Sequence, residues 1–192
     1  MVASILEQTR DLDFRLIISD NMSADGTADI IRQKFPQVTV VENHENGGFG
    51  KGHNAVMDML DSKYHFIINP DIFLTNDAVG EFIDYFESHD DVVMAVPKLV
   101  YEDGTEQFTP KLTPSVKYMM GGRLEKFGNP FKRWRDEYTM RGKNVTEPVD
   151  CGFCSGCFIC IRTDIFKSIG GFDERYFLYS EDADLTREAQ KY

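Results

Sequence analysis

Strand-like and helix-like segments alternate along this chain of 192 residues, and no other feature restricts its fold as much. Short runs rich in β-branched and aromatic residues are typical of strands buried on both faces, and the segments between them carry helical spacing. The expected strands are residues 14–19, 38–41, 64–69, 92–99 and 157–161. The expected helices are residues 25–35, 51–61, 76–88 and 163–169, the last ended by Gly170 and Gly171. This alternation predicts an α/β fold with a mostly parallel sheet flanked by helices.

Length and charge narrow the functional classes. A chain of this size suits one domain with a substantial core. Its formal net charge of −11 argues against nucleic acid as the main partner, because phosphate binding needs a basic face. The sequence has no apolar run long enough to cross a bilayer and no signal-peptide pattern at its N-terminus. We therefore expect a cytoplasmic protein.

One segment departs from the acidic average. Residues 111–143 hold nine basic side chains against three acidic ones. The same residues include large apolar side chains: Tyr118, Met119, Met120, Phe127, Phe131, Trp134 and Tyr138. Such a mixture suits peripheral contact with an anionic membrane surface, here the inner face of the cell membrane, or with a lipid phosphate. It equally suits a solvated, irregular insertion whose aromatic residues cover the core.

Four cysteines recur at every third position. Cys151, Cys154, Cys157 and Cys160 invite an iron–sulfur or zinc interpretation. However, a period of three along a strand points successive thiols to opposite faces, so one strand cannot gather four of them on one ion. Free cysteine also behaves as a small core hydrophobe. We therefore predict that these thiols belong to the core.

Turns that follow the first two expected strands carry residues suited to ligand binding. In such sheets, ligands bind beyond the carboxyl ends of the strands. Asp20 ends the first strand, and Asn21 and Ser23 are turn formers that can simply bond their own backbone. A glycine-rich stretch, residues 46–54, follows the second strand, and its repeated glycines allow close approach of a phosphate or sugar. Its spacing matches neither the P-loop nor the dinucleotide fingerprint.

The third strand ends in Asn69-Pro70-Asp71. A carboxylate delivered by an apolar strand and stiffened by proline suits a hard cation, although the tripeptide alone is also a common turn. One carboxylate is enough for magnesium when phosphates of a substrate supply other oxygens.

Clustered carboxylates follow an apolar, aromatic run near the end of the chain. Glu181, Asp182 and Asp184 lie just after residues 177–179. Taken alone, they fit a helix start capped by Ser180, since carboxylates suit the positive helix end. They also fit a desolvated catalytic carboxylate at the rim of a core.

Together, the order and spacing of these motifs resemble the inverting family 2 glycosyltransferases of GT-A (Rossmann-like) fold. The closest likeness is to the rhamnosyltransferase-like branch, which builds bacterial cell-surface polysaccharides. The stretches that carry the resemblance are residues 18–27, 46–54, 69–71, 150–162 and 170–185, so it covers nearly the whole chain.

The resemblance implies a role for each motif. Asp20 is expected to bond the pyrimidine base, Asp71 to bind a divalent cation (Mg²⁺ or Mn²⁺), and Asp182, beside Glu181, to act as general base. The expected donor-binding residues are Asp20, Asn21, Ser23, Gly48, Gly50, Asn54 and Asn69. The implied donor is a nucleotide diphosphate sugar, dTDP-rhamnose in this branch. The implied acceptor is a hydroxyl of a glycan or lipid-linked glycan.

The chain also departs from the family pattern. Residues 1–192 are expected to form a single incomplete GT-A domain, because residues 1–10 already resemble the helix that follows the family's first strand. The family's C-terminal segment is likewise expected to be missing. An absent central strand leaves backbone edges open, which favours pairing with a second copy. Two other functions therefore stay open: an inactive module that binds a nucleotide or partner, and a sugar nucleotidyltransferase.

Overall fold

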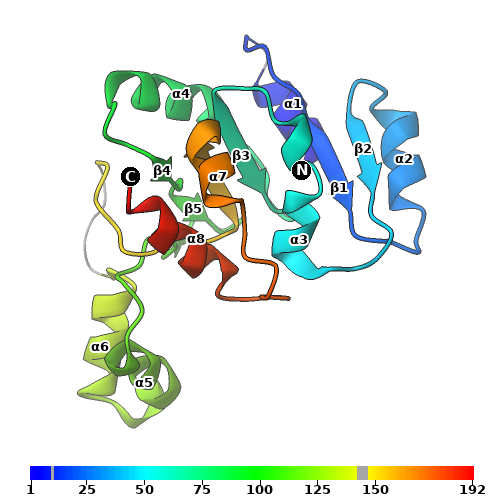
Figure 1. The fold of residues 1–192 in the computed structure, drawn as a ribbon. Helices are drawn as coiled ribbons and strands as arrows, with labels where there is room; N and C mark the ends of the chain where they lie inside the picture. Colours follow the sequence, from blue (N-terminus) through cyan, green and yellow to red (C-terminus); the bar gives the residue numbers. More distant parts are fainter. Residues whose placement is uncertain (10, 142–146) are drawn as a thin grey trace.

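The computed structural model describes residues 1–9, 11–141 and 147–192, which fold into strands and helices in alternating order (Figure 1). The first half contains α1 (Val2–Gln8), β1 (Ile17–Asp20), α2 (Thr27–Lys34), β2 (Thr39–Glu42), α3 (Gly48–Asn54), β3 (Tyr64–Ile68) and α4 (Ala78–Ser88). The second half contains β4 (Met94–Ala95), β5 (Leu99–Val100), β6 (Glu106–Gln107), α5 (Val116–Leu124), α6 (Phe131–Tyr138), β7 (Phe158–Arg162), α7 (Thr163–Ile169) and α8 (Glu181–Ala189). The predicted α/β class is confirmed. A helix was expected over residues 1–10, and α1 occupies most of this range; Arg10 lies outside the described residues.

Strand pairing differs from the expected mostly parallel sheet. β1 and β2 pair in parallel, with Ile17 opposite Thr39. β7 lies between β3 and β4 and runs antiparallel to both. β5 and β6 form a separate antiparallel pair. The expectation of a largely parallel sheet was therefore wrong for the central strands, because a continuous apolar run indicates burial on both faces but carries no information about strand direction.

The core surrounds β7. Residues 158–161 of this strand are at most 1% exposed. Ile159 and Ile161 face a cluster that includes Phe166 of α7 and Leu185 of α8. Phe158, on the opposite face, packs with residues of α1 and α4. Helices α7 and α8 thus cover one face of the strand, and α1 and α4 cover the other.

Cys160 bears out the core interpretation of the cysteines. Its side chain is fully buried and packs with Tyr64 and Phe86. All four cysteines are free thiols. Cys154 is also buried, whereas Cys151 and Cys157 are only half-buried. The core interpretation therefore holds fully for two of the four.

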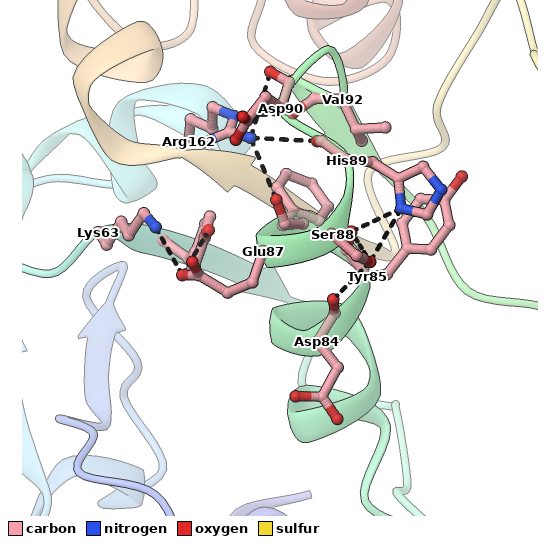
Figure 2. A network of polar contacts seen from close by, with 11 residues as sticks. Lys63, Asp84, Tyr85, Glu87, Ser88, His89, Asp90, Val92 and Arg162 are labelled. Atoms are coloured by element: carbon pink, nitrogen blue, oxygen red, sulfur yellow. Dashed lines mark hydrogen bonds and ion pairs between the residues drawn. The ribbon is translucent and has the colours of Figure 1, made fainter.

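Arg162, the last residue of β7, closes the C-terminal end of α4 (Figure 2). Its guanidinium group donates hydrogen bonds to the carbonyl oxygens of Phe86, His89 and Val92, at 3.3, 3.2 and 2.8 Å. The last carbonyl groups of a helix have no partner within the helix, and a cation suits the negative end of the helix dipole. The same group also lies 5.7 Å from the ring centroid of Phe86, a cation–π contact.

Residues 116–138 form a helical hairpin of α5, a short 3₁₀ turn and α6, which projects from the rest of the molecule in Figure 1. The expectation of an irregular insertion was therefore wrong. The expectation that its aromatic residues cover the core was wrong as well, because Tyr118 and Tyr138 stack on each other at 5.2 Å. Phe127 is 66% exposed. Residues 142 and 143 of the basic segment lie outside the described residues.

Candidate functional site

The turn after β1 connects that strand to the start of α3. Asp20 is only 6% exposed, and its Oδ2 accepts a hydrogen bond from the Ser23 amide at 3.2 Å. Asn21 donates from Nδ2 to the carbonyl oxygen of Gly48 at 2.9 Å, while its Oδ1 accepts from Asn43 at 2.7 Å. Asn21 therefore fixes the glycine-rich segment against the end of β1.

The glycines of α3 make room for the chain itself. Gly48 has φ +86°, and an added Cβ would lie 2.8 Å from the carbonyl carbon of Phe177 and closer still to its oxygen. At Gly50 an added Cβ would lie 2.8 Å from the Cβ of Phe172. Close approach was the expected use of these glycines, and here the approaching group is the segment 172–177. Their contact with a donor stays a prediction.

Asn54, at the end of α3, is engaged in the same packing. Its Nδ2 donates to the Phe172 carbonyl oxygen at 2.8 Å, and its Oδ1 accepts from the Phe172 amide at 2.9 Å. A side chain that satisfies both backbone groups of one residue acts as a clamp between segments. Asn54 thus holds the chain that leads from α7 into α8.

The turn after β3 offers oxygen atoms for a cation. The Oδ1 atom of Asn69 is buried and has no hydrogen-bond partner, a condition that native structures rarely leave unexplained. Asp71 is exposed. An amide oxygen and a carboxylate are hard donors of the type that Mg²⁺ and Mn²⁺ prefer, so these two residues fit the expected cation. Within the described residues, no three His, Cys, Asp or Glu side chains gather around a common metal position.

The carboxylates of α8 do more than open the helix. Ser180 has φ +75°, and its side chain makes no capping hydrogen bond, so the capping interpretation was wrong. The Oδ2 atom of Asp182 instead accepts from the amide of Gly156 at 3.0 Å. Glu181 is 5% exposed and its Oε2 has no hydrogen-bond partner. Burial raises the pKa of Glu181.

Three parts of the predicted site meet on residues 156 and 157. The Asn69 amide donates to the carbonyl oxygen of Cys157 at 2.9 Å, which joins the turn after β3 to this segment. At the neighbouring Gly156, an added Cβ would lie 3.4 Å from Asp182 of α8 and 3.4 Å from the Phe49 ring of α3. The ends of β3, α3 and α8 are therefore in contact. Asp20 is connected to this cluster indirectly, because its neighbour Asn21 is hydrogen-bonded to Gly48 of α3.

Lys111 and Tyr138, at the base of the helical hairpin, were missed by the sequence analysis. Both are half-buried. Burial lowers the pKa of Lys111, while the charge of Asp182 acts in the opposite direction. Burial raises the pKa of Tyr138, and the same Asp182 charge adds to the effect. A cation and a phenol thus lie within electrostatic reach of Asp182. The basic character of residues 111–143 was a signal for them, but it was assigned to a membrane.

A groove of about 980 Å³ opens elsewhere, between β4 and the C-terminal part of α8. Its lining includes Met94, Cys151, Cys154 and Gln190, and none of the predicted site residues. The groove is therefore separate from the site assembled above.

The chain belongs to the family 2 glycosyltransferases. The model of the family described as glycosyl transferase family 2 matches residues 1–170. Among curated proteins, an N-acetylglucosaminyl-diphospho-decaprenol L-rhamnosyltransferase of Mycobacterium tuberculosis is 27% identical over 184 residues, 88% of this chain and 59% of that protein. The rhamnosyltransferase WbbL of Escherichia coli is 22% identical over 190 residues, 91% of this chain and 66% of that protein. The chain thus spans about six tenths of the length of these relatives.

Solved glycosyltransferase structures share the fold. TarS 1–349 of S. aureus in complex with UDP matches with a TM-score of 0.63 and 16% identity, over 98% of this chain and 49% of that one. The mannosyltransferase PcManGT of Pyrobaculum calidifontis, solved with GDP-Man and Mn²⁺, matches with a TM-score of 0.63 and 14% identity, over 98% and 46%. The expected GT-A fold is therefore confirmed.

Proposed function

We propose that this chain carries the donor site and the general base of an inverting glycosyltransferase, which moves a sugar from a nucleoside diphosphate to an acceptor hydroxyl. The observation that carries the proposal is the contact of Asn69 and Asp182 with adjacent residues, Cys157 and Gly156. A displacement at the anomeric carbon has the leaving group on one side and the general base on the other. The residues that bind the leaving group and the residue that acts as base must therefore lie close together. The turn after β3 and the start of α8 would supply these two sides.

Asp182 would take the proton of the acceptor hydroxyl. Its carboxylate is oriented through both oxygens, because Oδ2 accepts from Gly156 and Oδ1 from the Ala183 amide at 2.9 Å. Each oxygen keeps a second lone pair for the hydroxyl proton. A positioned base contributes roughly 10²–10⁴ in rate. A single displacement needs no enzyme nucleophile and inverts the anomeric carbon.

Asp71 and Asn69 would hold the divalent cation. Two protein oxygens leave coordination positions for the diphosphate, which is how magnesium is commonly held beside substrate phosphates. When bound, the cation neutralises the negative charge that develops on the departing nucleoside diphosphate. The Pyrobaculum neighbour solved with GDP-Man and Mn²⁺ supports the use of a divalent cation.

The proposed donor is dTDP-rhamnose, and the proposed acceptor is a hydroxyl of a lipid-linked glycan in cell-surface polysaccharide synthesis. The names of the two relatives, both rhamnosyltransferases, support the sugar. The decaprenol in the first name supports a lipid-linked acceptor. Asp20, buried at the end of β1, would bond the base, with Ser23 closing the turn around it.

Calorimetric titration of dTDP, UDP and GDP, with and without Mn²⁺, tests the donor site. We expect one diphosphate, dTDP, to bind more tightly with Mn²⁺, and Asp71→Ala to remove that dependence. Asp84→Ala serves as the control, because Asp84 is an exposed carboxylate on α4. Binding of none of the three diphosphates would contradict a donor site in this chain.

Rhamnosyl transfer to a lipid-linked acceptor tests the base. We expect Asp182→Asn to lower turnover by about 10²-fold or more while diphosphate binding is unchanged. Asp184→Asn is the matched control, since Asp184 is a half-buried carboxylate two residues further along α8. Near wild-type turnover in Asp182→Asn would rule out the base. Diphosphate binding without any turnover would instead favour a binding module.

We also propose that the helical hairpin touches the cytoplasmic face of the membrane. Val116, Met119 and Phe127 are 74%, 68% and 66% exposed. Arg123 and Lys126 are exposed between them, and neither forms an ion pair with a described residue. Apolar side chains beside unpaired cations suit an anionic lipid surface. Among the described residues, no helix has the length and apolarity to cross a bilayer.

Sedimentation with anionic and with neutral vesicles tests this contact. We expect binding to anionic vesicles, weakened by salt and by Phe127→Ser. Tyr101→Ser is the control, because Tyr101 is 58% exposed but lies outside the hairpin. Equal, negligible binding to both kinds of vesicle would overturn the proposal.

Self-association is a further part of the proposal. Among the described residues, β1 pairs with β2 alone and β3 with β7 alone, so each strand has one unpaired edge. Unpaired edges can add a strand from another chain. Light scattering across a range of concentrations should show a homo-oligomer, and a monomer at every concentration would contradict it.

A further inference from the structure

We propose that Cys151 and Cys154 form a redox-active dithiol, which closes to a disulfide when it reacts with a low-molecular-weight disulfide. Their Sγ atoms lie 3.7 Å apart and share a hydrogen bond. A Cys-x-x-Cys spacing with adjacent thiols is the arrangement of dithiol oxidoreductase motifs. Cytosolic disulfides, where they occur, are mostly transient and redox-sensing.

A kink in the backbone brings the two thiols to one side. In a regular strand, residues three apart point to opposite faces, and this separation was expected for the two thiols. Here the amides of Gly152 and Phe153 both donate to the carbonyl oxygen of Lys111, at 2.8 and 3.1 Å. Two residues opposite one is the pattern of a β-bulge, which turns the following side chain. The expected separation was therefore wrong for this pair.

Gly152 is needed for the kink. An added Cβ at this position would lie 2.9 Å from the carbonyl carbon of Leu112 and closer still to the amide nitrogen of Thr113. The backbone at Gly152 thus packs directly against the backbone of residues 112 and 113. This contact fixes the geometry of the Cys151–Cys154 pair.

The pair is reachable and chemically poised. Both cysteines line the groove between β4 and α8, and Cys151 is half-buried. The hydrogen bond with Cys154 lowers the pKa of Cys151, whereas the same bond and burial raise the pKa of Cys154. Cys151 is therefore the attacking thiolate, and Cys154 is the buried thiol that resolves the intermediate.

The reaction balances with one small disulfide. The Cys151 thiolate attacks a sulfur of oxidised glutathione, forms a mixed disulfide and releases one glutathione thiolate. The Cys154 sulfur then attacks the Cys151 sulfur, which releases the second glutathione. The two protein thiols are oxidised by two electrons, the glutathione disulfide is reduced, and the two protons pass to the glutathione thiols.

The disulfide would act on α8 through two contacts. The Cys154 amide donates to Thr186 Oγ1 at 3.1 Å, and this hydroxyl donates to the Asp182 carbonyl oxygen at 2.7 Å. Gly156, two residues beyond Cys154, donates to the Asp182 carboxylate. The Sγ atoms must approach from 3.7 Å to about 2.0 Å to bond, and we expect this approach to move residues 151–156 relative to α8. The effect on catalysis rests on the proposed function, but the disulfide itself does not.

Thiol mapping in glutathione buffers tests the dithiol. The reduced protein is equilibrated with oxidised and reduced glutathione at several ratios, quenched in acid, alkylated and analysed by peptide mass spectrometry. We expect a Cys151–Cys154 disulfide, lighter by two hydrogens, that dithiothreitol reverses. Cys154→Ser should instead accumulate glutathione on Cys151, and Cys157→Ser should behave as the wild type. Alkylation of both Cys151 and Cys154 at every ratio would overturn the proposal, as would a lasting mixed disulfide in the wild type.

Hydrogen exchange supplies a readout that needs no substrate. On oxidation we expect the Gly156 amide to exchange about fivefold faster, the factor that corresponds to one ordinary hydrogen bond. An unchanged rate with the disulfide formed would overturn the link to α8. Titration of the reduced protein with dTDP separates the donor-site proposal from the dithiol proposal. If dTDP does not bind, the donor site is contradicted, but the result of the thiol mapping is unaffected.

Discussion

Replacing Gly48 by alanine tests whether the glycine-rich segment serves packing. Gly48 has φ +86°, a conformation that costs a residue with a Cβ roughly 1–2 kcal/mol. The added Cβ would also collide with the Phe177 carbonyl group, so α3 or the segment around Phe177 must move. That movement breaks the hydrogen bond from the Phe49 amide to Phe177, at 3.0 Å, and the one from Asn21 to Gly48, at 2.9 Å. Each is worth about 1 kcal/mol.

The expected loss for Gly48→Ala is therefore about 3–4 kcal/mol in the free energy of unfolding. Gly104→Ala is the matched control, because Gly104 also has a positive φ, +80°, but an added Cβ there meets nothing within 4 Å. Its loss should be about 1–2 kcal/mol, from backbone strain alone.

Urea unfolding followed by circular dichroism measures both losses. With a slope of about 2 kcal/mol per molar urea, the midpoint should fall by roughly 1.5–2 M in Gly48→Ala, against about 0.5–1 M in the control. Equal losses in the two variants would refute the reasoning, because the collision with Phe177 would then contribute nothing.

Two further predictions concern titrating groups. Because burial raises the pKa of Glu181, its negative charge destabilises the fold as pH rises through that pKa. Glu181→Gln should therefore raise the free energy of unfolding by about 1 kcal/mol at pH 8 and leave it unchanged at pH 4. The control Glu102→Gln, at an exposed position, should have no effect at either pH. Burial lowers the pKa of His53 and His65 from 6.5 to about 4, so the unfolded chain binds more protons in this window. Stability should fall by roughly 2–3 kcal/mol for each histidine between pH 6.5 and 4, measured by urea midpoints. His65→Gln should remove about half of this dependence, whereas exposed His44→Gln should not change it.

Local signals predicted some elements closely. α7 spans residues 163–169 as expected, because Gly170 adopts the left-handed conformation, φ +89°, that ends a helix. β7 was predicted because residues 158–161 are apolar without interruption. Its antiparallel pairing was not, since direction is decided by how distant strands meet. The helical hairpin was missed because exposed Val116 and Met119 on α5 blur the apolar periodicity that identifies a helix.

The candidate site was predicted as a set of positions, but not as a set of contacts. Asp182 followed from clustered carboxylates, yet its bond to Gly156 joins residues 26 apart and has no local signature. Asn54 was expected to face a donor, whereas its amide holds the backbone of Phe172. Cys151 and Cys154 were assigned to opposite faces, because no pattern in the sequence announces the bulge at Gly152. Contacts between residues that are far apart in the sequence could therefore not be predicted.

The position of Arg162 has a consequence for how this chain can diversify. β4 and β7 are hydrogen-bonded neighbours, with Ala95 opposite Cys160, and Arg162 ties the loop before β4 to the end of β7. The stretch between those strands, residues 96–157, therefore leaves the sheet and returns to almost the same point. Doubling the length of such an excursion costs only about 0.6 kcal/mol of closure entropy. Evolution can thus exchange the helical hairpin for another element of different length, while the sheet that carries Asp71 and supports Asp182 stays as it is.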